Sequence, residues 1–385
     1  MHEFLLGLSV ACFGFAVLFF LQLAVNCRRI AFLSDGHVPP GPIDWPPASI
    51  IVPARNEARD IERAVESLLK QDYPNYELIV VNDRSTDGTR EILDRMVAEH
   101  PQLRTFHLEV LPAGWLGKNH AMHFAAERAS GELLLFTDAD VVMRPDTLCR
   151  AVHHLQSAKI DHLTMVPDLD MPSKLLDAIV VTFMIFFSAY IRPWKVTNPK
   201  SKAHVGIGAF NLMRAEVYQA IGTHATIRMR PDDDLKLGKL VKLGGFKQAI
   251  VNGQDLICVR WYASVGEMIQ GLMKNAFSGV DYRLEFVVFG TLTLLTFFIW
   301  PMVGIFLATG VSCWLYAGAM VCHMLLFADT ARQARVAPWL CVLLPVGILL
   351  LIYIQWRATI LTYVYRGIRW RGTHYSLSEL KSNKI

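Results

Sequence analysis

The sequence predicts an α/β fold with a mostly parallel, wound sheet, and transmembrane helices at its N- and C-terminal ends. Three observations lead to this prediction. From residue 48 onward, short apolar runs alternate with segments of helical periodicity. Within residues 131–141, a short apolar run leads straight into two carboxylates, as expected of a strand buried on both faces. Long apolar runs with few charges occupy residues 4–25 and most of the C-terminal third.

The composition favours a membrane protein over a nucleic-acid-binding protein. Of the 385 residues, 53% are hydrophobic and 19% are charged, and the net charge is only +4. Lysine and arginine stand beside apolar segments instead of alternating with aromatic residues, which indicates membrane topology. The seven cysteines include no C-x-x-C pair, so neither a zinc site nor a disulfide framework is predicted. We therefore expect the membrane, and no nucleic acid, as a partner.

The chain divides into segments of different composition. Residues 1–27 are predicted to be a retained transmembrane anchor, because the apolar run is too long for a secretory signal and no cleavage site of small residues follows it. Arg28 and Arg29 then predict that the following domain is cytoplasmic. The remaining segments are a proline-rich linker at 28–47, the α/β domain at 48–262, an amphipathic interfacial segment at 263–285, a transmembrane region at 286–365 and a basic tail at 366–385.

Polar clusters follow the predicted strands of the α/β domain. Strands are expected at 48–52, 77–81 and 103–108, and helices at 60–70, 89–99 and 118–129. Because ligands of such sheets bind at the carboxyl ends of the strands, the polar residues that follow them are expected at one rim. These residues are Arg55, Glu57, Asp83, Asp87, Asp138 and Asp140.

Asp138 and Asp140 are the candidate metal ligands. Two carboxylates one residue apart repel each other unless a cation lies between them, and a divalent cation can also hold phosphates. A short D-x-D alone is more often a solvated turn. The metal interpretation therefore depends on the other clusters predicted at the same rim.

Four sequence blocks, in this order, resemble the family 2 glycosyltransferases, which have the GT-A nucleotide-sugar fold. The blocks are P-A-R-N-E at 53–57, V-V-N-D-R-S-T-D-G at 80–88, G-K-N-H-A at 117–121 and D-A-D at 138–140. The resemblance covers about residues 48–275.

This resemblance implies a nucleotide-sugar donor, UDP-linked by family habit, and a divalent metal, Mg or Mn. The residues that it places at the nucleoside are Pro53, Ala54, Arg55, Glu57 and Asp83, with Asp83 at the base or ribose. It implies that Asp138 and Asp140 hold the metal against the donor diphosphate. Lys118 follows a glycine at a predicted helix N-terminus and would add positive charge near the donor; a solvated lysine in the first turn is the alternative.

Three adjacent aspartates at 232–234 open another predicted helix. Carboxylates are favourable at helix N-termini, which is a purely structural reason for them. In the family that this chain resembles, an acidic residue four positions before the glycine of a Leu-Gly pair is the general base. That spacing selects Asp234, with Asp233 as the alternative. A base is needed because an acceptor hydroxyl is a poor nucleophile until it loses its proton.

The Q-x-x-R-W motif of lipid-linked and processive members is not found where it is expected. Arg260-Trp261 lacks the glutamine, although residues 264–277 have amphipathic periodicity. Lys274 in this segment is the candidate for stabilising the departing diphosphate. The missing motif weighs against polymer synthesis.

The apolar segments raise a question of topology. Residues 175–191 contain Asp177 and are expected to form a buried or interfacial helix, beside the route of a lipid acceptor. Spans are predicted at 286–308, 311–328 and 339–356. Three crossings would place the basic tail outside, against the positive-inside rule, unless the last span is re-entrant at Pro345.

These observations predict an inner-membrane, multi-pass, inverting glycosyltransferase whose catalytic domain is cytoplasmic. The expected acceptor is a lipid hydroxyl, by resemblance to ceramide, hopanoid and carotenoid sugar transferases. The alternatives are a polyprenyl-phosphate sugar synthase, a polysaccharide synthase, and a membrane protein that senses nucleotide sugars without catalysis. The sequence specifies neither the sugar, nor the lipid, nor the oligomeric state.

Overall fold

The computed structural model describes residues 2–36 and 44–385, and these form two compact units. The unit that carries the residues of the predicted active site is called the catalytic unit here, and it consists of Ile30–Asp170, Arg192–Trp261 and Gly367–Ile385. The membrane unit consists of Met1–Arg29, Met171–Ile191 and Tyr262–Arg366. Part of the predicted linker at 28–47 lies outside the described residues.

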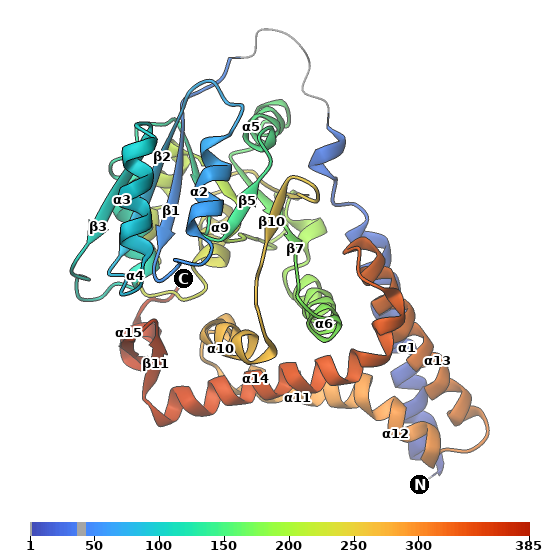
Figure 1. The fold of residues 1–385 in the computed structure, drawn as a ribbon. Helices are drawn as coiled ribbons and strands as arrows, with labels where there is room; N and C mark the ends of the chain where they lie inside the picture. Colours follow the sequence, from blue (N-terminus) through green and yellow to red (C-terminus); the bar gives the residue numbers. More distant parts are fainter. Residues whose placement is uncertain (1, 37–43) are drawn as a thin grey trace. The chain divides into compact units, whose positions relative to one another are not determined.

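A mostly parallel seven-stranded sheet forms the centre of the catalytic unit (Figure 1). In spatial order its strands are β3 (Leu103–Leu108), β2 (Tyr76–Asp83), β1 (Ala48–Ala54), β4 (Leu133–Phe136), β8 (Asn211–Arg214), β6 (His162–Val166) and β9 (Gln248–Asn252). All neighbours pair in parallel except β8, which is antiparallel to β4 and to β6. The predicted α/β fold class is confirmed.

Helices cover both faces of this sheet, because its strands are apolar on both sides. Ile50 and Val52 of β1 face one core, whereas Ile51 between them faces the other. The first core contains side chains of α2 (Ile61–Leu69), α3 (Thr89–Glu99) and α5 (Thr147–Ser157). The second contains side chains of α4 (Gly117–Ala126), α7 (Ala215–Ala220) and α9 (Asp233–Leu243).

A smaller sheet of three strands completes the main body of this unit. It has the order β5 (Val141–Met143), β10 (Ile257–Val259) and β7 (Asp168–Leu169).

The segment predicted to be a basic tail is folded, and this corrects the prediction. It forms a hairpin of β11 (Gly367–Trp370) and β12 (Thr373–Ser376), followed by α15 (Leu377–Ser382), and it belongs to the catalytic unit. Arg371 and Gly372 form the two-residue turn with φ of 49° and 78°, as a tight hairpin of matching twist requires. Ser376 and Glu379 form a capping box that starts α15.

The membrane unit is made of long apolar helices. They are α1 (His2–Cys27), α6 (Lys174–Ile191), α10 (Val265–Ala276), α11 (Leu284–Leu294), α12 (Trp300–Leu307), α13 (Val311–Gln333) and α14 (Leu344–Val364). Among the described residues, five helical segments are long and apolar enough to cross a membrane: Glu3–Cys27, Lys174–Lys195, Leu284–Leu307, Val311–Gln333 and Pro338–Val364. A π-helical turn at Leu295–Ile299 joins α11 to α12.

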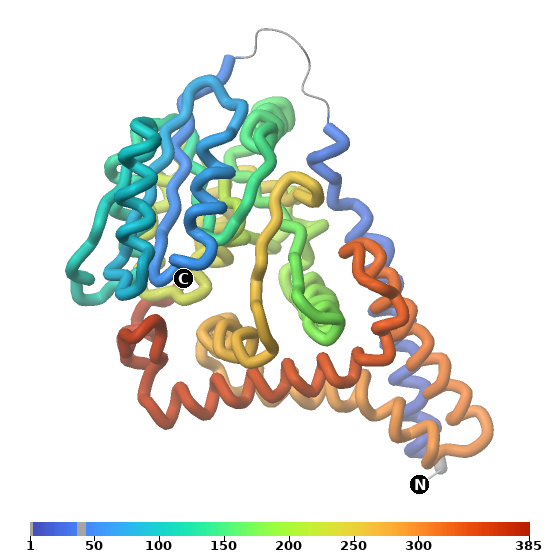
Figure 2. Tube along the Cα trace, in the orientation of Figure 1, coloured from blue at the N-terminus to red at the C-terminus, as the bar shows by residue number. Residues whose placement is uncertain are grey.

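Packing within the membrane unit joins its N-terminal and C-terminal parts. Helix α1 runs along α13 (Figure 2), and Phe15 of α1 stacks on Phe297 with ring centroids 4.3 Å apart. Helix α6 packs on α14, where a Cβ on Gly347 would lie 2.4 Å from the hydroxyl of Thr182. The predicted α/β domain at 48–262 is therefore interrupted, because its residues 171–191 pack with the membrane helices.

Candidate active site

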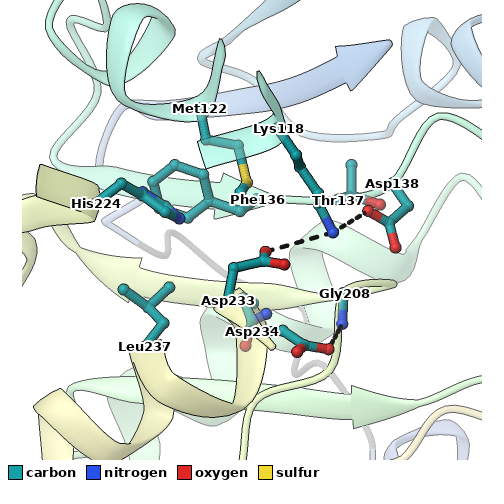
Figure 3. A pocket seen from close by; sticks show the side chains of 11 residues that line it. Lys118, Met122, Phe136, Thr137, Asp138, Gly208, His224, Asp233, Asp234 and Leu237 are labelled. Carbon is teal, nitrogen blue, oxygen red and sulfur yellow. Dashed lines mark hydrogen bonds and ion pairs between the residues drawn. The ribbon is translucent and has the colours of Figure 1, made fainter. Parts of the chain in front are cut away.

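Three side chains from distant parts of the chain meet in one pocket of the catalytic unit (Figure 3). Asp138 follows β4, Lys118 lies in the first turn of α4, and Asp233 is the first residue of α9. The Lys118 Nζ lies 2.7 Å from Asp138 Oδ1 and 3.4 Å from Asp233 Oδ2. Burial alone lowers the pKa of Lys118, but the charges of Asp138 and Asp233 outweigh burial and raise it. The lysine is therefore a fixed cation between two carboxylates.

Asp234, the second residue of α9, lines the same pocket and is held there by the loop before β8. The N–H of Gly208 donates to Asp234 Oδ2 at 2.9 Å, and its carbonyl accepts from the N–H of Asp138 at 3.0 Å. A Cβ on Gly208 would lie 2.5 Å from Asp138 Oδ2, so a larger residue would displace this carboxylate. The structure thus shows close approach of the Gly208 backbone to both Asp138 and Asp234.

The three aspartates that open α9 have different surroundings. Asp232 is buried and accepts two hydrogen bonds from the guanidinium of Arg230, each 3.0 Å long. The Nζ of Lys236 lies 3.7 Å from the same carboxylate. Asp232 thus belongs to a buried ion network, whereas Asp233 and Asp234 line the pocket.

Asp140 lies near two other carboxylates, Asp138 and Glu57. Burial, followed by the charges of Asp138 and Glu57, raises the pKa of Asp140. Burial also raises the pKa of Glu57, in opposition to Arg371. Such mutual repulsion would be relieved by a cation.

A divalent metal fits this set of donors only if the substrate supplies further ligands. Within residues 2–36 and 44–385, no three His, Cys, Asp or Glu side chains are arranged to hold a metal ion. Two aspartates with phosphate and water oxygens are, however, an ordinary ligand set for Mg²⁺. The residues that would hold the cation are Asp138 and Asp140.

The predicted nucleoside residues lie on neighbouring strands. Asp83 at the end of β2 is buried, and its Oδ2 lies 3.4 Å from Arg55 Nη1 at the end of β1. Arg84, to which the sequence analysis gave no role, donates to both oxygens of Asp83 at 2.7 and 2.9 Å. Pro53 and Ala54 pair with residues of β2 in the parallel ladder. The remaining rim residue, Asp87, accepts from the backbone of Ala58 and Thr89 and has a local structural role.

Residues of the C-terminal hairpin also contact this region, which the sequence analysis missed. Arg371 Nη2 lies 2.6 Å from Glu57 Oε1, and Arg371 Nη1 donates to the carbonyl of Arg55. The backbone N–H of Gly117 donates to the hydroxyl of Tyr375 at 3.4 Å. The sequence does contain a signal for this hairpin, because Gly372 lies among aromatic and basic residues, which is typical of a turn between two strands. Lys274 lies on α10 in the membrane unit.

Comparison with known proteins agrees with this fold. Residues 49–222 match the family model of Glycosyl transferase family 2. The beta-monoglucosyldiacylglycerol synthase of Synechocystis is 32% identical over 143 residues, which are 35% of this chain and 29% of that protein. The 4,4'-diaponeurosporenoate glycosyltransferase of Staphylococcus aureus is 23% identical over 233 residues, 60% of this chain and 61% of that protein. The chain thus spans less than two thirds of the length of each of these relatives.

A solved structure shows the same fold. The mannosyltransferase PcManGT from Pyrobaculum calidifontis, in complex with GDP-Man and Mn2+, superposes with a TM-score of 0.55 at 19% identity. The match covers 94% of this chain and 98% of that one. The family model thus matches residues 49–222, somewhat less than half of the chain, and the solved structure shares the fold of this chain.

Proposed function

We propose that this protein transfers a sugar from a nucleotide-diphosphate donor, UDP-linked in the first instance, to a hydroxyl group of a membrane lipid. One observation carries the proposal. Lys118, Asp138, Asp233 and Asp234 line one pocket, in a chain that also has five segments able to cross a membrane. With a divalent cation bound, such carboxylates can hold a diphosphate, and the apolar helices suit a lipid.

On the donor side, the proposed nucleoside residues are Pro53, Ala54, Arg55, Glu57 and Asp83. Bound Mg²⁺ or Mn²⁺ at Asp138 and Asp140 would neutralise charge on the diphosphate as the sugar leaves. Lys118 lies 2.7 Å from Asp138 and is close enough to contact the same phosphates. Lys274 stays a candidate for the departing diphosphate.

On the acceptor side, Asp234 is the proposed general base. Asp233 is buried, and its carboxylate lies within ion-pair distance of Lys118. Asp234 is only partly buried, and the N–H of Gly208 fixes one of its oxygens. Its carboxylate takes the proton of the acceptor hydroxyl while that oxygen bonds to the anomeric carbon. The bond from this carbon to the diphosphate breaks in the same step, so the nucleoside diphosphate leaves and the configuration inverts.

A lipid acceptor is supported by the relatives as well as by the helices. One relative is named for a glucosyldiacylglycerol and another for a carotenoid acid, and both names describe lipids. Neither name fixes the lipid of this chain. The proposal is therefore a glycolipid product of unspecified lipid class.

The division into units supports a membrane topology. The chain leaves the catalytic unit at Asp170 and re-enters it at Arg192, so α6 starts and ends on the same side of the membrane. Tyr262–Arg366 also has both ends joined to that unit, so it crosses an even number of times. We assign the two crossings to α11–α12 and α13, which pack together, while α14 does not cross. Under this assignment no re-entrant turn at Pro345 is needed. The positive-inside rule favours a cytoplasmic catalytic unit in a protein of the plasma (inner) membrane.

This topology can be tested by labelling single cysteines in a cysteine-free background. A cysteine at Thr309, between α12 and α13, should react with an impermeant reagent from outside intact cells. One at Arg335, after α13, should react only after the membrane is opened. Equal reaction at both positions would contradict the assignment.

The proposed function is tested with purified protein, a total lipid extract, and a panel of UDP- and GDP-linked sugars. Mass spectrometry should find a lipid that has gained one sugar unit. This product should disappear with chelator and with Asp140→Ala, whereas Asp170→Ala, an exposed aspartate of the same unit, should leave it unchanged. Nucleotide-sugar binding without any product would instead favour a sensing role.

Asp234→Asn separates the hydroxyl acceptor from a phosphate acceptor. Loss of a general base lowers transfer to a hydroxyl by about a hundredfold to ten-thousandfold. A polyprenyl phosphate needs no base, so a synthase of that class would keep most of its activity. A ladder of long products would favour a polysaccharide synthase.

A further inference from the structure

The C-terminal segment Gly367–Ile385 contacts several loops that form the candidate active site. The contacting residues are far apart in the sequence; Arg371 and Glu57, for example, are separated by 314 positions. The contacts are also specific: they involve a guanidinium, a phenol hydroxyl, an amide side chain and the last carbonyl of the sequence. They fall into three groups, each on a different loop.

The first contact fixes the loop after β1. Arg371 pairs with Glu57 at 2.6 Å and donates to the backbone carbonyl of Arg55. One guanidinium thus holds a backbone group and a side chain of the same loop. Arg55 in turn lies 3.4 Å from Asp83, so the position of this loop affects the proposed nucleoside site. Without Arg371, no guanidinium would offset the repulsion between the mostly buried carboxylate of Glu57 and those of Asp138 and Asp140.

The second contact fixes the turn before α4. Tyr375 is 6% exposed, and its hydroxyl accepts from the N–H of Gly117. It also interacts with the guanidinium of Arg84, whose main partner is Asp83. A Cβ on Gly117 would lie only 2.1 Å from Asp83 Oδ2, so this turn packs directly against that carboxylate. Lys118, the cation of the pocket, is the next residue along the chain.

The third contact fixes the loop that precedes the three aspartates of α9. Asn383 accepts from the N–H of Met229 at 3.0 Å and donates to the carbonyl of Thr226 at 2.7 Å. The carbonyl of Ile385 accepts from Lys239 Nζ on α9 at 2.6 Å. The segment therefore contacts the loops on the donor side and the helix that carries Asp234.

We infer that Gly367–Ile385 is a strap that sets the geometry of the donor site, with Arg371 and Tyr375 as positioning residues. This inference rests on the proposed function. The strap follows Arg366, the last residue of the membrane unit, so the site is completed only when the chain returns from the membrane to the catalytic unit. The strap is thus one of the chain segments that join the catalytic unit directly to the membrane unit.

The first test compares Arg371→Ala with Arg371→Lys and with the matched control Lys381→Ala, an exposed cation of the same segment. Charge-assisted hydrogen bonds of this kind are lost with Arg371→Ala, so the KM for the nucleotide sugar should rise by about tenfold to a hundredfold. The KM for the lipid and kcat should change much less. Arg371→Lys keeps a positive charge opposite Glu57 but lacks the planar guanidinium with its several N–H donors. Its donor KM should therefore lie between those of the wild type and Arg371→Ala. Tyr375→Phe should raise the same KM by about fivefold.

A second test needs no activity. Hydrogen exchange of the amides at residues 54–58 and 116–119 should become faster in Arg371→Ala and Tyr375→Phe, whereas β6 and β9 stay protected. If the wild-type enzyme transfers sugar but Arg371→Ala and Tyr375→Phe leave the donor KM and the exchange rates unchanged, the strap is overturned. The proposed function then still stands. A wild-type protein that neither transfers sugar nor binds UDP or GDP with MgCl₂ in calorimetry would overturn both.

Discussion

The two units of this protein expose apolar side chains in opposite ways. In the catalytic unit, the large hydrophobic side chains that are exposed among the described residues are Phe32, Val110 and Leu243. In the membrane unit they are numerous, and Phe306 is 87% and Trp314 is 79% exposed. Both units bury apolar side chains in their interiors, and they differ in the apolar side chains that they leave on the surface. An apolar surface of this extent is stable in lipid and would be costly in water.

Charged residues show the complementary difference. The catalytic unit buries an ion network at Arg230, Asp232 and Lys236 and gathers carboxylates and Lys118 in one pocket. In the described part of the membrane unit, ion pairs join Arg28 to Asp329, Lys174 to Asp177 and Arg283 to Glu285, all at or near helix ends. Under the proposed function, chemistry and lipid contact are divided between the units, and the predictions below test this division.

The largest expected effect is on chemistry alone. Asp140→Asn should lower sugar transfer at least about a thousandfold, equivalent to about 4 kcal/mol, because the proposed cation loses a ligand. It should not lower the melting temperature, since Asp140 repels Asp138 and Glu57 in the absence of a cation. Membrane fractionation should be unchanged. A variant that retains activity with stability unaltered would exclude Asp140 from the metal site.

A buried ion pair should dominate the stability of the catalytic unit. Asp232→Asn leaves Arg230 with a weakened partner in a buried site and should cost about 3 kcal/mol of unfolding free energy. The matched surface variant Glu62→Gln, which removes an exposed pair with Arg95, should cost less than about 1 kcal/mol. Thermal unfolding of both variants measures the difference. Equal losses would mean that the buried network contributes no more to stability than an exposed surface pair.

Two exposed valines allow a direct comparison of the media around the units. Val321→Arg, in the middle of α13 with 53% exposure, should cost about 3 kcal/mol of membrane insertion. Val110→Arg, in the catalytic unit with 75% exposure, should have no effect on expression, fractionation or activity. Membrane-integrated protein is measured after carbonate extraction. If both variants insert normally, α13 does not face lipid at Val321.

The smallest effect concerns acid stability. His162 is buried, and burial lowers its pKa from 6.5 to about 4. Its ring bonds to Asn211 and to the amide of Gln248, and the latter bond requires the neutral ring. The unfolded chain binds a proton below pH 6.5 that the folded chain refuses until about pH 4, so stability falls as the pH falls through this window. The loss should be about 2 kcal/mol between pH 7 and pH 5, and it should be smaller in His162→Gln.

The sequence alone determined the elements whose signals are local. Apolar strands that end in polar residues, such as the one before Asp138, and the helix at Thr89–Glu99 were predictable because side-chain periodicity follows from backbone geometry. The four blocks of residues were also enough to indicate the family and the carboxylates at the rim. The resemblance could name Asp234, but it could not distinguish its surroundings from those of Asp232.

Only the tertiary structure decided the relations between distant segments. Lys118 between Asp138 and Asp233, and Arg371 on Glu57, depend on contacts whose partners are separated by tens to hundreds of residues. The tail illustrates the reason. Its basic and aromatic residues give no strong period, so its order arises from the surface it packs against rather than from its own propensity. Long-range packing also assigned α6 to the membrane helices, although its sequence lies inside the catalytic domain.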